Sequence, residues 1–119
     1  MREILFRGYA GITKKWLHGH FYNVGKRCYI TDNSGLNSYE MYEVIPESVG
    51  QFTGLCDRNG VKIFEGDIVG ALGFRAEIIC KDAGYYYKSH ALAGLRPLTK
   101  PDANNKFTVI GNTYEGETP

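Results

Sequence analysis

The sequence predicts a mainly β protein, with a small SH3-like barrel in its C-terminal part, an N-terminal β-hairpin extension and little helix. Glycines divide the chain into apolar runs of roughly four to seven residues, which is the length of strands joined by turns. The 119 residues include nine Tyr, six Phe and one Trp, and aromatic side chains favour pleated, half-buried surfaces. Gly66-Asp67 leads directly into the apolar Ile68-Val69. This arrangement is frequent at the entry strand of SH3-like barrels, which close a sheet on itself.

The N-terminal part is expected to form short strands and one helical turn. Candidate strands are residues 4–9, 16–22, 27–31 and 39–45, and the second and third of these form a hairpin. Pro46 favours a helical turn over 46–49, because proline suits the first position of a helix. A regular rhythm of short strands begins near Val49, which predicts an N-terminal β extension, 1–48, and a barrel domain, 49–119. One continuous domain, 1–119, is the alternative.

The clearest local pattern is a hairpin whose strands, 51–56 and 61–64, flank the turn Asp57-Arg58-Asn59-Gly60. Asp at the first position and Gly at the fourth fit a type I turn closed by a glycine with left-handed backbone. Only glycine adopts that conformation without steric cost.

The remaining segments follow in chain order. They are a turn at 65–67, a strand at 68–72, strands 75–81 and 85–88 around a turn at 82–84, an undecided stretch at 89–98 with a helical turn at 90–95 as one option, a polar loop at 99–105, and a closing strand at 107–110.

Composition restricts the classes of protein. The formal net charge is +1 with interspersed signs, so charge neither requires nor excludes a nucleic-acid partner. The three cysteines are odd in number and lack metal-site spacing, which predicts free thiols within strands and a reducing compartment. The N-terminus does not resemble a signal peptide, and no segment has the roughly 20 apolar residues of a membrane helix. A cytoplasmic protein without membrane contact is expected.

The segments Gln51-Phe52-Thr53-Gly54-Leu55, Asp57-Arg58-Asn59-Gly60 and Ile63-Phe64-Glu65-Gly66-Asp67-Ile68-Val69 together resemble the YopX family, small proteins carried by bacteriophages and prophages. Val109-Ile110-Gly111-Asn112-Thr113-Tyr114-Glu115 matches the end of the family pattern, and Arg2 to Arg7 resembles its opening strand. The resemblance implies a mostly β fold and a phage or prophage origin, and it implies no activity. With that origin, the expected cytoplasm is that of the bacterial host. The signature residues are Gln51, Thr53, Gly54, Leu55, Asp57, Asn59, Gly60, Glu65, Gly66, Asp67, Ile68, Val69, Gly111 and Asn112.

Two groups of residues are candidate metal ligands or catalysts. His18 and His20 have strand spacing and share one face, but a metal site needs a third ligand. Glu65 and Asp67 could hold Mg²⁺, yet turn positions explain both without chemistry. The sequence therefore predicts no metal site and no catalytic residue. It also has no P-loop or dinucleotide fingerprint, so no cofactor is expected.

The candidate binding residues are Tyr85, Tyr87, Lys88 and Arg75. Aromatic side chains on a strand beside cations can stack on unpaired bases. Tyr85 and Tyr87 share one face of the strand, and at least one face serves the core.

The sequence favours a non-enzymatic binding or adaptor module that acts in phage growth or host takeover, with an unknown protein or a nucleic acid as partner. The alternative is a metal-dependent enzyme acting on nucleic acid through Glu65 and Asp67. Self-association into a homo-oligomer is left open, because exposed tyrosines and free strand edges would favour it.

Overall fold

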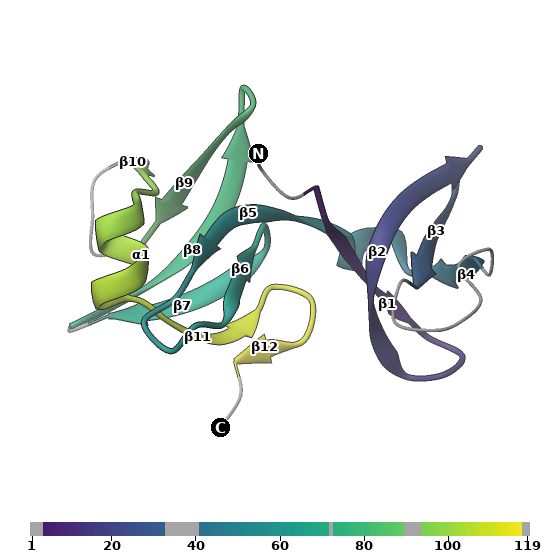
Figure 1. Ribbon diagram of the computed structural model, residues 1–119, viewed down its shortest axis with the longest axis horizontal. Coiled ribbons are helices and arrows are strands. Elements are labelled where there is room, and N and C mark those ends of the chain that lie inside the picture. The colour runs from purple at the N-terminus through teal and green to yellow at the C-terminus, as the bar shows by residue number, and fades with distance from the viewer. Residues whose placement is uncertain (1–3, 33–40, 72, 90–93, 118–119) are drawn as a thin grey trace. The chain divides into compact units, whose positions relative to one another are not determined.

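The computed structural model describes residues 4–32, 41–71, 73–89 and 94–117 and divides the chain into two compact units, residues 1–52 (unit 1) and 53–119 (unit 2). Figure 1 draws the described strands as arrows and the helix α1, which follows β10, as a coiled ribbon. The elements are β1 Phe6–Ala10, β2 Lys15–Val24, β3 Arg27–Asp32, β4 Met41–Val44, the 3₁₀ turn η1 Pro46–Ser48, β5 Gly50–Cys56, β6 Lys62–Phe64, β7 Asp67–Ala71, β8 Phe74–Lys81, β9 Gly84–Lys88, β10 Arg96–Pro97, α1 Lys100–Lys106, β11 Thr108–Asn112 and β12 Gly116–Glu117.

The strands form two six-stranded sheets, in the orders β4-β3-β2-β1-β5-β6 and β10-β9-β8-β7-β11-β12. The pairings between β1, β2, β3 and β4, and those between β7, β8, β9 and β11, are antiparallel. The prediction of a mainly β fold with little helix is confirmed. Closure of unit 2 into an SH3-like barrel stays a prediction, as does the domain boundary near Val49.

Unit 1 contains the four strands predicted for the N-terminal part, and β1 to β4 form a continuous antiparallel meander. Its core contains Ala10, Ile30 and Val44, with Phe6, Leu17, Phe21, Cys28 and Val49 packed against them. Gly8 lets the backbone of β1 approach the Val44 side chain closely, since a Cβ at position 8 would lie 2.8 Å from Cγ2 of Val44.

The predicted helical turn after Pro46 is present as η1 and is attached to β1. The Oγ atom of Ser48 accepts a hydrogen bond from the Tyr9 N–H at 2.7 Å, and its hydroxyl donates to the Ile45 carbonyl at 2.6 Å. Ser48 is buried, so its hydroxyl satisfies backbone groups that water does not reach.

Unit 2 has its own core, formed by Ile63, Val69, Ala76, Ile78, Tyr87, Ala103 and Phe107. β11 lies between β7 and β12 in the sheet order, and a register shift between Val109 and Gly111 marks a β-bulge in its pairing with β7. The cysteines lie in β3, β5 and β8 and are free thiols, as predicted.

The prediction of a polar loop over 99–105 is wrong, because α1 occupies Lys100–Lys106. The Thr99 hydroxyl caps the helix by accepting a hydrogen bond from the Asp102 N–H at 3.3 Å, and Pro101 lies in the first turn. Asp102 and Lys106 form an i,i+4 ion pair at 3.3 Å. Capping, proline placement and charge order all stabilise a helix, and Ala103 anchors it in the core.

Other outcomes concern chain ends and gaps. The strand β12 was not predicted. The option of a helical turn at 90–95 lies mostly outside the described residues, as do positions 39, 40 and 72 of two predicted strands. Within the described part of the chain, no helix is long and apolar enough to cross a membrane.

Candidate binding groove

Asp57 organises the turn between β5 and β6 and is only 4% exposed. Its Oδ1 atom accepts hydrogen bonds from the N–H groups of Asn59, at 2.8 Å, and Val61, at 2.9 Å. Its carbonyl accepts from the Gly60 N–H at 3.0 Å. Gly60 has a φ of +82°, so the predicted turn closed by a left-handed glycine is confirmed. The remaining oxygen, Oδ2, accepts from the Val109 N–H at 2.9 Å and ties the turn to β11.

Thr53 and Asp67 in unit 2 also hydrogen-bond backbone groups through buried side chains. The Thr53 hydroxyl donates to the Ile63 carbonyl at 2.8 Å and accepts from the Leu55 N–H at 3.2 Å, beside Gly54 with a φ of +89°. Asp67 is 1% exposed, and its Oδ2 atom accepts from the Phe64 N–H at 2.7 Å. Buried polar groups that bond the backbone in this way hold turns and bulges in one geometry.

At the C-terminal end of the signature, Asn112 likewise hydrogen-bonds the backbone. Oδ1 of Asn112 accepts from the N–H groups of Tyr114, at 3.1 Å, and Glu115, at 2.8 Å, and the Thr113 N–H donates to the Gly66 carbonyl at 2.7 Å. Of the other signature residues, Gln51 pairs with Phe6 of β1, Ile68 pairs with Glu77 of β8, and Val69 lies in the core. The signature segments therefore specify backbone geometry.

The positions weighed as metal ligands do not come together. His18 and His20 lie on one face of β2, opposite Arg7 and Thr31 respectively. The Asp67 carboxylate caps the turn that contains Glu65. Among the described residues, no group of three or more His, Cys, Asp or Glu side chains is arranged to hold a metal ion.

The sheet separates the candidate binding residues into two pairs. Tyr85 and Tyr87 lie opposite Cys80 and Ile78, on the core side of β9. Lys88 lies opposite Glu77, and Arg75 lies opposite Gly70, both on the other side, because side chains alternate along a strand. The cations therefore share a face with Tyr86 rather than with Tyr85 and Tyr87.

Tyr87 is a core residue, 9% exposed, and this burial contradicts its proposed role in stacking on bases. Its ring packs edge-on against Phe107 at a centroid distance of 5.1 Å and stacks with Phe74 at 6.4 Å. Phe74 and Phe107 also meet edge-on at 6.4 Å. The three rings form an aromatic cluster that fixes the position of Phe74.

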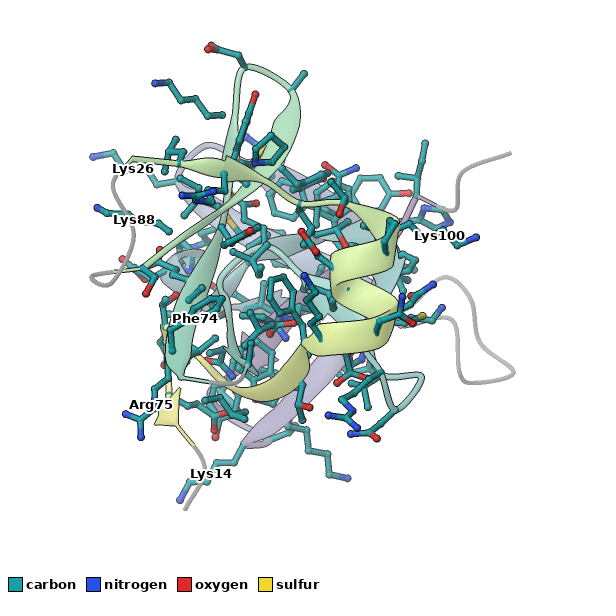
Figure 2. The ribbon with its side chains drawn as sticks, turned by 90° about the vertical axis from the view of Figure 1, so that its left-hand side faces the viewer. Lys14, Lys26, Phe74, Arg75, Lys88 and Lys100 are labelled. Carbon is teal, nitrogen blue, oxygen red and sulfur yellow. The ribbon has the colours of Figure 1, made fainter. Side chains whose placement is uncertain are left out.

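Phe74 also lines an open groove in unit 2, of about 830 Å³, which we call the basic groove. The turn before β8, the end of α1 and β11 contribute its walls. Its lining includes Arg58, Phe74, Arg75, Lys106, Thr108 and Ile110. Figure 2 shows Phe74 and Arg75 at neighbouring positions of β8, with Arg75 directed outward.

The groove combines positive charge with an apolar floor. Arg58, Arg75 and Lys106 are exposed cations, and none of the described lining residues is acidic. Lys106 lies 3.3 Å from Asp102, but an exposed pair of this kind holds its lysine only weakly. The Arg58 N–H donates to the Phe107 carbonyl at 2.9 Å, so the backbone beneath this cation is fixed to the aromatic cluster.

Sequence reasoning identified Arg75 and missed the other two cations. The sequence pattern assigns Arg58 only to a turn, and Lys106 belongs to the helix that the sequence did not predict. Thr99, Pro101 and Asp102 were the available signals for that helix. No local pattern places Arg58 and Lys106 together, because hydrogen bonds over a long sequence separation join their segments.

The comparisons with known proteins concern nearly the whole chain. The model of the family described as YopX protein matches residues 5–118. The structure of protein EF1440 from Enterococcus faecalis is similar, with a TM-score of 0.58 and 21% sequence identity, over 97% of this chain and 96% of that one. At this identity the likeness shows the fold alone. No curated protein matches the chain. Because the match extends from the first described strand to the last, this chain belongs to the YopX family.

Proposed function

We propose that this protein is a non-enzymatic binding module that holds an anionic partner in the basic groove, in the context of phage growth or host takeover. The observation that carries the proposal is the charge of the groove. Three exposed cations surround it, and its described lining contains no carboxylate. A concave surface lined by one sign of charge concentrates ligands of the opposite sign.

The apolar floor of the groove adds shape-specific contacts to the electrostatic attraction. Phe74 is held from behind by Tyr87 and Phe107, so little side-chain entropy is lost when a ligand packs on it. Ile110 and Thr108 extend the floor along β11. A partner with acidic groups and an apolar or planar portion complements these residues.

The metal-dependent enzyme proposed from Glu65 and Asp67 has no comparable support. The Asp67 carboxylate is buried and already bonds the Phe64 N–H. Turn capping accounts for its position without a metal ion.

The test is fluorescence anisotropy with two labelled probes, an oligothymidylate and a glutamate-rich peptide. The double variant Arg58→Ala/Lys106→Ala should weaken binding of the preferred probe by about tenfold, which corresponds to about 1.4 kcal/mol. Lys100→Ala is the matched control, because it removes one exposed charge from the same helix at a position that does not line the groove. Lys100 is labelled in Figure 2. If neither probe binds, or if both variants weaken binding equally, the groove is not the binding site.

A further inference from the structure

The sheet of unit 1 has two faces of different chemistry. Residues directly opposite each other on paired strands project to the same side. Phe6, Leu17, Phe21 and Ile30 project towards the core. The other side carries side chains that we call the aromatic face, namely Tyr9, Trp16, His18, His20, Tyr22 and Tyr29.

Two pairs of aromatic residues mark the ends of this face. Tyr9 lies opposite Trp16, with ring centroids 5.4 Å apart, and Tyr22 lies opposite Tyr29. Trp16 and Tyr22 are six positions apart on β2, so the pairs are separated by about 20 Å along the strand. Tyr22 is 49% exposed. A ring this exposed contributes little buried apolar surface to the stability of the fold, and it offers a flat surface to a planar ligand.

Cations accompany the rings. The Arg7 guanidinium lies over the Trp16 ring, 5.0 Å from its centroid. Lys14 and Lys26 lie in the turns at the two ends of β2. Both are labelled in Figure 2, Lys14 near the bottom and Lys26 at the upper left. Glu43 is the one acid among the described residues on this side of β1 to β4, and Arg27 lies 3.9 Å from it.

We infer that the aromatic face binds single-stranded nucleic acid, with bases stacked on Tyr22 and Tyr29 and the phosphate backbone attracted by Lys14, Lys26 and Arg7. Successive aromatic rings beside cations are the arrangement that holds unpaired bases without sequence preference. An acidic peptide would use the cations but not the two separated pairs of rings. This site is distinct in its residues from the basic groove and does not depend on it.

The chain carries its own reporter for this binding. Trp16 is the one tryptophan of the sequence, so intrinsic tryptophan fluorescence observes the aromatic face directly. Titration with an unlabelled oligothymidylate should quench this fluorescence, and the apparent affinity should fall as salt rises. A blunt duplex should quench less at the same nucleotide concentration, because its bases are already stacked and paired.

Tyr22→Ala should weaken oligothymidylate binding by about fivefold or more, the effect of losing one stacked base. Tyr22→Phe should retain the affinity, since it keeps the ring. Tyr114→Ala is the matched control, because Tyr114 is 38% exposed and lies in the turn before β12. Circular dichroism of each variant verifies that the sheet is intact.

The outcomes separate this inference from the proposed groove. Oligonucleotide binding that quenches Trp16 and depends on Tyr22, but not on Arg58 and Lys106, supports the aromatic face and argues against the groove. Binding that depends on Arg58 and Lys106, but leaves Trp16 fluorescence unchanged and ignores Tyr22→Ala, overturns the inference and keeps the groove. Quenching by the glutamate-rich peptide, with none by the oligonucleotide, also overturns it and identifies a protein-binding face.

Discussion

Asp57 and Val109 are 52 positions apart in the sequence, yet the Asp57 carboxylate accepts a hydrogen bond from the Val109 N–H at 2.9 Å. The same side chain also bonds the N–H groups of Asn59 and Val61. One buried carboxylate therefore fixes a tight turn and connects it to β11, which lies between β7 and β12 in the second sheet.

Replacing Asp57 by alanine should lower the free energy of unfolding by about 2–4 kcal/mol, because several backbone donors lose their acceptor in a poorly hydrated place. Urea denaturation followed by circular dichroism measures the loss. Asp102→Ala is the control, since it removes a single, partly exposed ion pair and should cost no more than about 1 kcal/mol. Equal losses in the two variants would contradict the role given to Asp57.

Gly60→Val should lower the free energy of unfolding by more than about 1 kcal/mol. Nothing lies within 4 Å of a Cβ built at this position, so the cost comes from the left-handed backbone and not from a clash. Gly60→Asn should cost less, because asparagine tolerates this conformation. Thermal melting of both variants checks the order, and an unchanged melting temperature for Gly60→Val would refute the turn assignment.

Gly8→Ala should destabilise unit 1 for the opposite reason, a lack of space. The added Cβ would meet Val44 Cγ2 at 2.8 Å and Cβ at 2.9 Å, and overpacking of this kind costs about 1–3 kcal/mol. Val44→Gly removes the Cβ as well as both methyl groups, so the double variant should be more stable than the two single losses predict. A double-mutant cycle that gives a coupling below about 0.5 kcal/mol would show that Val44 is not the obstacle.

Ala83→Gly should raise the free energy of unfolding by about 0.5–1 kcal/mol. Asp82 and Ala83 join β8 to β9 with φ values of +51° and +65°, and a side chain in that conformation is strained. Ala10→Gly provides the contrast, because Ala10 is buried in β1 and its loss should be destabilising. Guanidinium denaturation of both variants measures the sign, and a destabilised Ala83→Gly would contradict the prediction.

Local chemistry explains which elements could be predicted. The turn at Asp57–Gly60 and the strands on either side of it depend on neighbours in the sequence, and the structure confirms them. The sequence also contains the signal for helix α1, since Thr99 and Asp102 form its cap, but the polar composition of this segment favours a loop. A helix this short is stabilised mainly by tertiary packing, here by the burial of Ala103 in the core.

The candidate sites depend on which strands pair and on which side each residue projects. Alternation along β9 placed Tyr85 and Tyr87 together correctly, but it could not assign their face to the core. The register of β8 against β7 and β9 decides that Arg75 and Lys88 project to the other side. The aromatic face is likewise a product of pairing, because Trp16 and Tyr22 meet their partners only across β1 and β3.

The position of β11 beside β7 has a consequence for the order in which the protein is made. The strands β1 to β4 have their partners within the first 56 residues. In contrast, β7 cannot pair with β11, and the Asp57 carboxylate cannot bond the Val109 N–H, until the chain has been synthesised through β11. Roughly 60 residues separate the start of unit 2 from the end of β11, which a ribosome translates in about 3–12 s. During that interval β1 to β5 can pair as they emerge from the ribosome, while β7 still lacks its neighbour β11.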